Sequence, residues 1–114
     1  GIPSELGKLT FLQQLQLGHN SLSGTVPSEI GELTALRTVN LDWNEGLFGP
    51  LPTQIQLLGS LNQLAVENTQ LTEIDIICSG CATLSLFRSD CRDDQVPCSC
   101  CTHCCLGGLD CQEV

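Results

Sequence analysis

The sequence is short of basic residues and of long apolar runs, and each shortage narrows what the chain can be. Four Lys and Arg stand against 13 Asp and Glu, for a formal charge of −9. Nucleic acids and anionic membrane surfaces attract proteins through basic patches, so neither is expected as a partner. No apolar run approaches the roughly 20 residues that cross a bilayer, which argues against direct membrane insertion by this segment.

Aromatic residues and methionine are also scarce. Three Phe, one Trp and no Tyr leave the core to Leu, Ile and Val, as suits stacked repeats whose core is tiled with aliphatic side chains. The chain has no Met, and it opens at Gly1 within a partial copy of the repeated pattern described below. We therefore expect it to be the C-terminal part of a longer, processed protein.

Cysteine is absent from residues 1–77 and abundant afterwards. Nine cysteines in so short a chain are typical of oxidising compartments, so we expect an extracellular or cell-surface location through the secretory pathway. The same change in composition divides the chain into predicted domains at 1–77, the repeats, and 78–114, a terminal coil with a cysteine-rich cap. The predicted disulfide cysteines are Cys78, Cys81, Cys91, Cys98, Cys100, Cys101, Cys104, Cys105 and Cys111.

Two chemistries fit the dense run at 98–105. As a disulfide knot, it would stabilise a segment with too little apolar material to fold by burial, at about 2–5 kcal/mol per bridge. As a thiolate cluster with His103, it would bind zinc, although structural zinc sites normally separate their cysteine pairs by a dozen or more residues. Disulfides are the favoured interpretation, with no metal. An odd count leaves one thiol free, buried or paired outside this segment.

A spaced set of residues recurs about every 24 positions. The first complete copy is Leu12, Leu15, Leu17, Asn20, Leu22, Gly24, Val26, Pro27, Ile30, Gly31 and Leu33. The second is Leu36, Val39, Leu41, Asn44, Leu47, Gly49, Leu51, Pro52, Ile55 and Leu58. A partial copy precedes both, and a drifting third copy follows from Ser60. Because one copy buries too little apolar surface to be stable, the copies must stack and share a core.

The pattern L-x-x-L-x-L-x-x-N-x-L with a G-x-[VIL]-P-x-x-[LI]-G ending resembles the plant-type subclass of the leucine-rich repeat family over roughly 2–71. The CSCC-x-x-CC run is more loosely similar to the C-terminal caps of some secreted leucine-rich repeat proteins, including algal ones. The resemblance implies an α/β-type solenoid, a right-handed coil with short parallel strands on its concave face and a disulfide-rich cap. Strands are predicted around 14–17, 38–41, 63–66 and 83–86, with Leu15, Leu17, Val39, Leu41, Leu64 and Val66 pointing inward.

The repeat asparagines are predicted to hold the turn after each strand. A buried amide at Asn20 or Asn44 can bond backbone groups of its own and the neighbouring repeat. Thr69 replaces the third asparagine, and Glu73 replaces the glycine that follows it. Both changes predict a weaker third repeat.

Between the leucines lie the residues predicted to line the concave face as ligand-binding positions. They are Gln14, Gln16, His19, Thr38, Asn40, Asp42, Trp43, Gln63, Glu67 and Asn68. Together with Gly18 and Ala65, and stacked in register, these positions form the rows 14/38/63, 16/40/65, 18/42/67 and 19/43/68. Trp43 has two interpretations: an exposed anchor for a ligand, or packing onto the turn at Glu45 and Gly46.

No catalytic arrangement emerges from the residues. His19 and Asp42 occur at different offsets of the repeat, and nothing in the pattern places them around a serine; no phosphate-binding glycine motif is present. The family resemblance implies a non-enzymatic recognition module without a cofactor, binding a protein, peptide or glycan. The alternative is a structural subunit of an extracellular matrix or filament, which assembles through an open N-terminal repeat edge or the odd cysteine. A third reading places a catalytic domain upstream of Gly1.

Overall fold

Each repeat contributes a short strand, a second edge strand and a turn of 3-10 helix. The computed structural model describes residues 1–79, 84–90, 103–106 and 109–113. The short helices are η1 (Ser4–Lys8), η2 (Ser28–Glu32), η3 (Thr53–Leu57) and η4 (Ile74–Ser79). The strands are β1 (Gln14–Gln16), β2 (Ser23–Gly24), β3 (Thr38–Asn40), β4 (Gly46–Pro50), β5 (Gln63–Ala65), β6 (Gln70–Thr72), β7 (Leu86–Ser89), β8 (His103–Leu106) and β9 (Leu109–Glu113).

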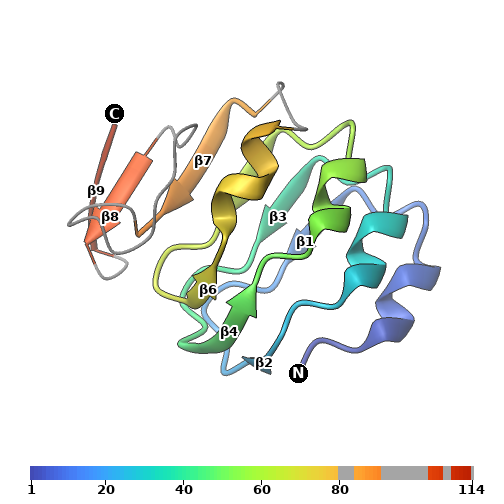
Figure 1. Ribbon diagram of the computed structural model, residues 1–114, viewed down its shortest axis with the longest axis horizontal. Helices are drawn as coiled ribbons and strands as arrows, with labels where there is room; N and C mark the ends of the chain where they lie inside the picture. Colours follow the sequence, from blue (N-terminus) through green and yellow to red (C-terminus); the bar gives the residue numbers. More distant parts are fainter. Residues whose placement is uncertain (80–83, 91–102, 107–108, 114) are drawn as a thin grey trace.

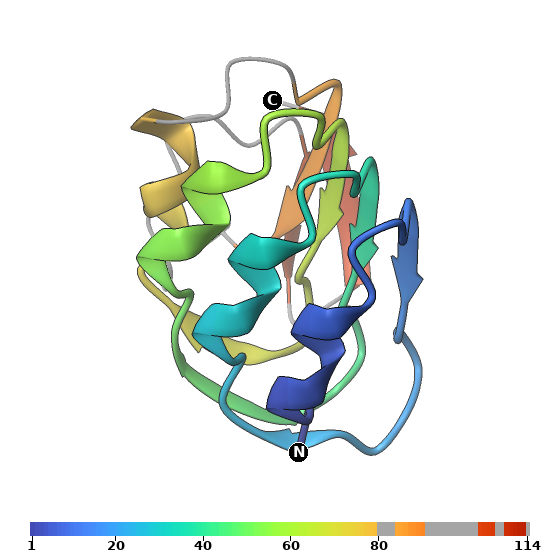
Figure 2. The ribbon, with the colours of Figure 1, turned by 90° about the vertical axis from the view of Figure 1, so that its right-hand side faces the viewer.

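Equivalent elements of successive repeats lie side by side (Figure 1). The main sheet has the order β1-β3-β5-β7-β8-β9, and β2-β4-β6 form a smaller sheet. Figure 2 shows the row of short helices on the side of the molecule away from the main sheet. The core lies between these layers, and each repeat closes part of it.

The sequence places the helices on this outer row through its prolines. Pro3, Pro27 and Pro52 each stand directly before a 3-10 helix, with φ of −75°, −73° and −65°. Proline fixes φ near these values and has no N–H to offer a sheet, so the chain leaves the edge strands at these points. The path from the edge strand back to the next strand of the main sheet therefore runs through a helix.

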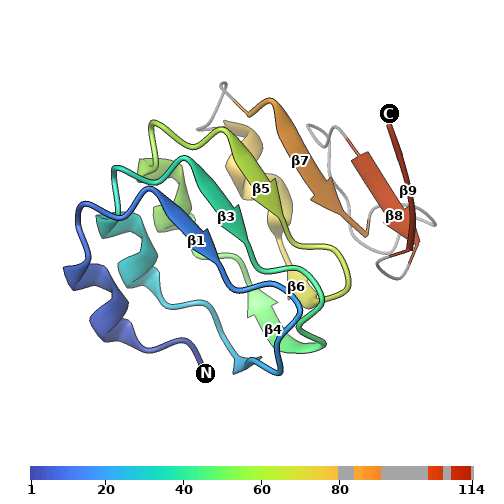
Figure 3. The same cartoon turned by 180° about the vertical axis from the view of Figure 1, so that it is seen from behind.

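The predicted parallel strands of the first three repeats are confirmed, each one residue shorter than expected. Leu15 pairs with Val39, and Val39 with Leu64, in a continuous parallel ladder (Figure 3). Five of the six residues predicted to point inward are buried, and Leu17 is partly buried against the same core.

A fourth parallel strand was predicted around 83–86; it is present, but the predicted bounds are wrong. Strand β7 starts at Leu86, and Leu64 pairs with Phe87. Phe87 is fully buried, whereas Leu86 is only half-buried. Because side chains alternate between the two faces of a strand, the core can accept Leu86 or Phe87 but not both. The larger apolar side chain occupies the core.

The main sheet continues beyond the repeats into the C-terminal segment. Strand β8 pairs in parallel with β7, and β9 turns back antiparallel to β8. Cys81, Cys91, Cys98, Cys100 and Cys101 lie outside the described residues, as do the side chains of Cys78, Cys104, Cys105 and Cys111. The disulfides and the division of the chain at 77 and 78 therefore stay predictions.

Candidate functional site

The outward surface of β1, β3, β5 and β7, with the turns that follow these strands, is the candidate site and is called the sheet face below. Its first rows have the predicted register: Gln14 lies beside Thr38, Thr38 beside Gln63, and Gln16 beside Asn40. The glutamines are exposed. Amide side chains at these positions can donate and accept hydrogen bonds at once, as recognition of an extended backbone requires.

The third row brings buried carboxylates together. The ladder continues past the strands, since the His19 amide donates to the Asp42 carbonyl (2.8 Å) and the Trp43 amide to the Glu67 carbonyl (2.9 Å). Asp42 is 6% exposed and Glu67 is 2% exposed. A Cβ at Gly18 would lie too close to the Asp42 carboxylate, so a larger residue there would displace that side chain. The predicted row is present, but its acids are buried instead of facing solvent.

Asp90 and Arg88 extend these rows and were missed by the sequence analysis. Arg88 pairs with Ala65 in the ladder, and the buried Asp90 accepts a hydrogen bond from the Asn68 amide. Reading Phe87 as the core residue would have found both, because the repeat pattern then places Arg88 on the outward face.

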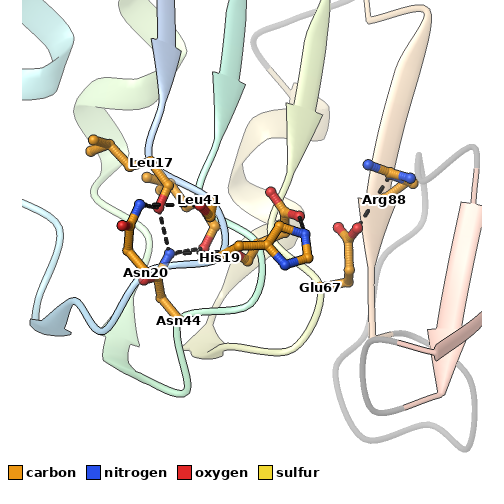
Figure 4. Close-up of polar contacts among 9 residues, drawn as sticks. Leu17, His19, Asn20, Leu41, Asn44, Glu67 and Arg88 are labelled. Carbon is orange, nitrogen blue, oxygen red and sulfur yellow. Dashed lines mark hydrogen bonds and ion pairs between the residues drawn. The ribbon is translucent and has the colours of Figure 1, made fainter.

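Each of two acids in the row has a basic side chain beside it (Figure 4). His19 Nε2 lies 3.3 Å from Asp42 Oδ2, with the imidazole 71% exposed, and Arg88 Nε lies 3.3 Å from Glu67 Oε1. The second contact is an ion pair without hydrogen-bond geometry, and Glu67 Oε2 has no hydrogen-bond partner among the described residues.

Burial raises the pKa of Glu67 above its ordinary value of 4.5. The charges of Asp42 and Asp90 act in the same direction, while a backbone hydrogen bond and Arg88 oppose the rise. Loss of solvation is the largest of these effects, so the neighbouring guanidinium only partly compensates for taking this carboxylate out of water.

The fourth row consists of residues in the left-handed region of backbone space. His19, Trp43 and Asn68 have φ of 56°, 58° and 54°. The His19 and Trp43 rings stack, with centroids 5.6 Å apart and 13° between their planes. A tryptophan at positive φ is unusual, and such conformations concentrate at functional sites.

Buried Asn44 holds in place the turn that follows β3, next to Trp43 (Figure 4). Its Nδ2 donates to the carbonyls of Leu17 (2.8 Å), Leu41 (3.0 Å) and Asp42 (3.2 Å), and its Oδ1 accepts from the Leu22 amide (3.0 Å). The predicted bonding to its own and the neighbouring repeat is confirmed.

Asn20 and Thr69, which occupy the position of Asn44 in the first and third repeats, make fewer such bonds. Asn20 is exposed and donates to the carbonyls of Leu17 and Gly18. Thr69 reaches the Val66 carbonyl and accepts from the Leu71 amide, both within its own repeat. The hydroxyl therefore reproduces part of what the amide does at Asn44.

Two hollows flank the stacked rings. The Arg88 hollow, of about 400 Å³, is lined by Gln16, Gly18, His19, Asn40, Asp42 and Arg88. The Trp43 hollow, of about 370 Å³, is lined by Asn20, Ser21, Leu22, Ser23, Trp43, Glu45, Gly46 and Asn68. Trp43 thus packs on His19 and also borders the hollow at the Glu45 turn, which combines features of both interpretations.

A third, more apolar hollow of about 380 Å³ lies on the first repeat, between Lys8 and Leu12. Phe11 there is 91% exposed and Leu9 is 52% exposed. Leu33 and Leu58, which follow η2 and η3 as Leu9 follows η1, are fully buried. The first repeat therefore exposes at Leu9 a side chain of the kind that later repeats bury.

Within the described part of the chain, no three His, Cys, Asp or Glu side chains are grouped so that they could hold a metal ion. The zinc alternative concerns His103 and cysteines whose side chains lie outside the described residues. In the same described part, no helix has both the length and the apolar character that crossing a membrane requires.

Comparisons with known proteins agree with this architecture. No protein-family model matches the chain, and no curated protein matches it. Among solved structures, the plant peptide hormone receptor RGFR1 in complex with RGF2 matches 77% of this chain at 30% identity, with a TM-score of 0.62. The match spans 14% of the receptor chain. With the parallel strands in two sheets, it supports an α/β repeat fold of the leucine-rich repeat kind.

Proposed function

We propose that the chain is a non-enzymatic, extracellular peptide- or protein-binding module of the leucine-rich repeat type. The proposal includes a right-handed solenoid closed by a disulfide-rich cap, in the plant-type subclass of the family. The observation that carries it is the sheet face, where amides and a stacked His–Trp pair are presented on a fold similar to that of a peptide hormone receptor.

The roles follow from exposure. Exposed Gln14, Gln16 and Gln63 would bond a ligand's backbone, and half-buried Trp43 would pack against an apolar or cationic side chain. Buried Asp42 and Glu67 would act indirectly, by fixing the positions of His19 and Arg88. Thr38, Asn40 and Asn68 complete the proposed contact surface.

A binding role without catalysis is supported by the composition of the site. The described residues that line the Arg88 hollow include the His19–Asp42 pair but no hydroxyl or thiol that it could activate. The net charge of −9 likewise disfavours nucleic acid as the ligand. No cofactor is proposed.

The test is selection from a random peptide library, followed by calorimetry with the selected peptides. Trp43→Ala should weaken binding by about 2 kcal/mol or more while stability changes little. The control is Leu57→Ala, which removes an exposed apolar side chain on η3. If the selected peptides bind both variants as tightly as the wild type, or if none is selected, the peptide-binding proposal fails.

The exposed edge of the first repeat favours a second candidate, a structural subunit. The occupant of that edge would be the same edge of another copy, because Leu9 offers the apolar surface that a neighbouring repeat covers at Leu33, and the exposed Phe11 enlarges it. Sedimentation should then show concentration-dependent association that Phe11→Ser abolishes. If the chain is a monomer at all concentrations, the structural candidate fails and the binding module is the remaining candidate.

A further inference from the structure

We infer that the Trp43 hollow binds the cationic side chain, lysine or arginine, of a peptide partner. The inference rests on the proposed function and adds a chemical class of ligand to it. It concerns the turns at the ends of the strands, with Glu45 and residues 20–23, which lie outside the contact surface described above.

The first argument is the charge of the lining. Among the described residues, Glu45 is the only ionisable one that borders the hollow, and no Lys, Arg or His does. Asn20, Ser21, Ser23 and Asn68 contribute polar groups around it. A hollow with one carboxylate, an aromatic ring and neutral hydrogen-bonding groups is complementary to an organic cation.

The second argument is the way Trp43 is held. Its backbone is in the left-handed region, its amide donates to the Glu67 carbonyl, and its ring stacks on His19. The stack occupies one face of the indole, so the ring is fixed in orientation while it borders the hollow. Indole is the best aromatic partner for an ammonium or guanidinium group, and a fixed ring loses less entropy on binding.

The third argument is the extra residue of the second repeat. Five positions separate Asn44 from Gly49, whereas four separate Asn20 from Gly24. The insertion carries Glu45, whose Oε1 accepts a hydrogen bond from Asn68 Nδ2 at 3.2 Å. The carboxylate is therefore steadied at the rim of the hollow and not left to rotate freely.

Gly46 completes the insertion by letting the two turns close on each other. A Cβ there would lie 2.9 Å from the Leu22 carbonyl oxygen and 3.0 Å from Ser23 Cβ. Because backbone is in the way, any other residue would push the turns of the first and second repeats apart. The residues Glu45 and Gly46 thus supply both the charge and the shape of the site.

The experiment uses Trp43 itself as the reporter, since it is the only tryptophan and the chain has no tyrosine. Tryptophan fluorescence is followed while N-acetyl-arginine amide, N-acetyl-lysine amide and a short oligo-arginine peptide are added. N-acetyl-glutamine amide and an oligo-glutamine peptide serve as neutral probes. Glu45→Gln removes the charge and keeps the shape, and Glu32→Gln removes the same charge at an exposed position on η2.

The basic probes should give a saturable change that the neutral probes do not. Glu45→Gln should weaken their binding by about three- to tenfold, and raising the salt from about 0.05 M to about 0.5 M should weaken it too. Glu32→Gln should leave it unchanged. Thermal unfolding of each variant confirms that the fold is intact.

Equal affinity of Glu45→Gln and Glu32→Gln for the basic probes would overturn the inference, as would equal binding of the neutral probes. Library peptides that bind in a Trp43-dependent way but contain no lysine or arginine would also overturn it, while the proposed function would stand. If the library yields no peptide and the basic probes still need Glu45, the site is supported and the proposed function fails. The two failures are therefore distinguishable.

Discussion

At the scale of single residues, the least satisfied group in the described structure is the Glu67 carboxylate. Its folded pKa is raised, chiefly by burial, so the folded state binds this proton more tightly than the unfolded chain does. The stability contributed by the protonated form is fully present below the ordinary value near 4.5. It is lost as the pH rises through the folded pKa.

Glu67→Gln should remove this loss, because an amide stays neutral at every pH. The free energy of unfolding of the variant, relative to the wild type, should therefore rise between about pH 4 and pH 7. Urea titrations at several pH values measure the difference, with exposed Glu32→Gln as control. A relative stability that falls over this range would mean that the Arg88 ion pair outweighs burial.

Asn44 is the residue whose removal should disturb the repeats most. Its amide bonds groups in two repeats, and Asn44→Ala leaves those buried groups without partners, at about 1–3 kcal/mol. Thr69→Ala should lower the free energy of unfolding clearly less, because Thr69 bonds only within its own repeat among the contacts described. Chemical denaturation compares the two variants. Equal losses would show that bonding between repeats adds nothing.

At the scale of elements, one position at or near the end of each edge strand adopts a left-handed backbone. Gly24 and Gly49 have φ of 84° and 82°, and Glu73, which replaces glycine in the third repeat, has φ of 53°. Glycine adopts this region freely, whereas other residues are disfavoured by about 1–2 kcal/mol.

Glu73→Gly should therefore stabilise the fold by up to about 1 kcal/mol, measured as the free energy of unfolding. Gly24→Ala is the reverse test: the added Cβ meets nothing closer than 3.8 Å, so only its backbone conformation opposes it. That variant should lose about 1 kcal/mol. Stabilisation by Gly24→Ala would contradict the account.

Element positions were predictable where one face of a strand is uniformly apolar. The spacing of Leu15, Val39 and Leu64 predicts the first three strands, since a slip by one residue would expose the core set. In the fourth repeat Leu84, Leu86 and Phe87 offer two registers, and only packing distinguishes them. The positions of Asp42 and Glu67 in the row were predictable, but their burial was not. The ion-pair partner of Glu67, Arg88, comes from another repeat.

At the scale of the whole molecule, the nine cysteines should be mostly cross-linked. Residues 91–111 contain few large apolar side chains, so burial alone cannot order them. Alkylation in denaturant without reductant, followed by mass measurement, should find one reactive thiol or none, and many more after reduction. Six or more free thiols, or protection that a chelator removes, would instead indicate a metal cluster and weaken the prediction of secretion.

The direction of β9 limits how copies of the chain can associate. A stack of parallel repeats has screw symmetry, so a further repeat at either end meets the same surroundings as the one before it. β9 runs against β8 and breaks that symmetry at one end, while β1 is the outer strand at the other. A copy therefore cannot continue the parallel ladder head to tail. A further repeat can therefore pair in parallel with β1 but not with β9.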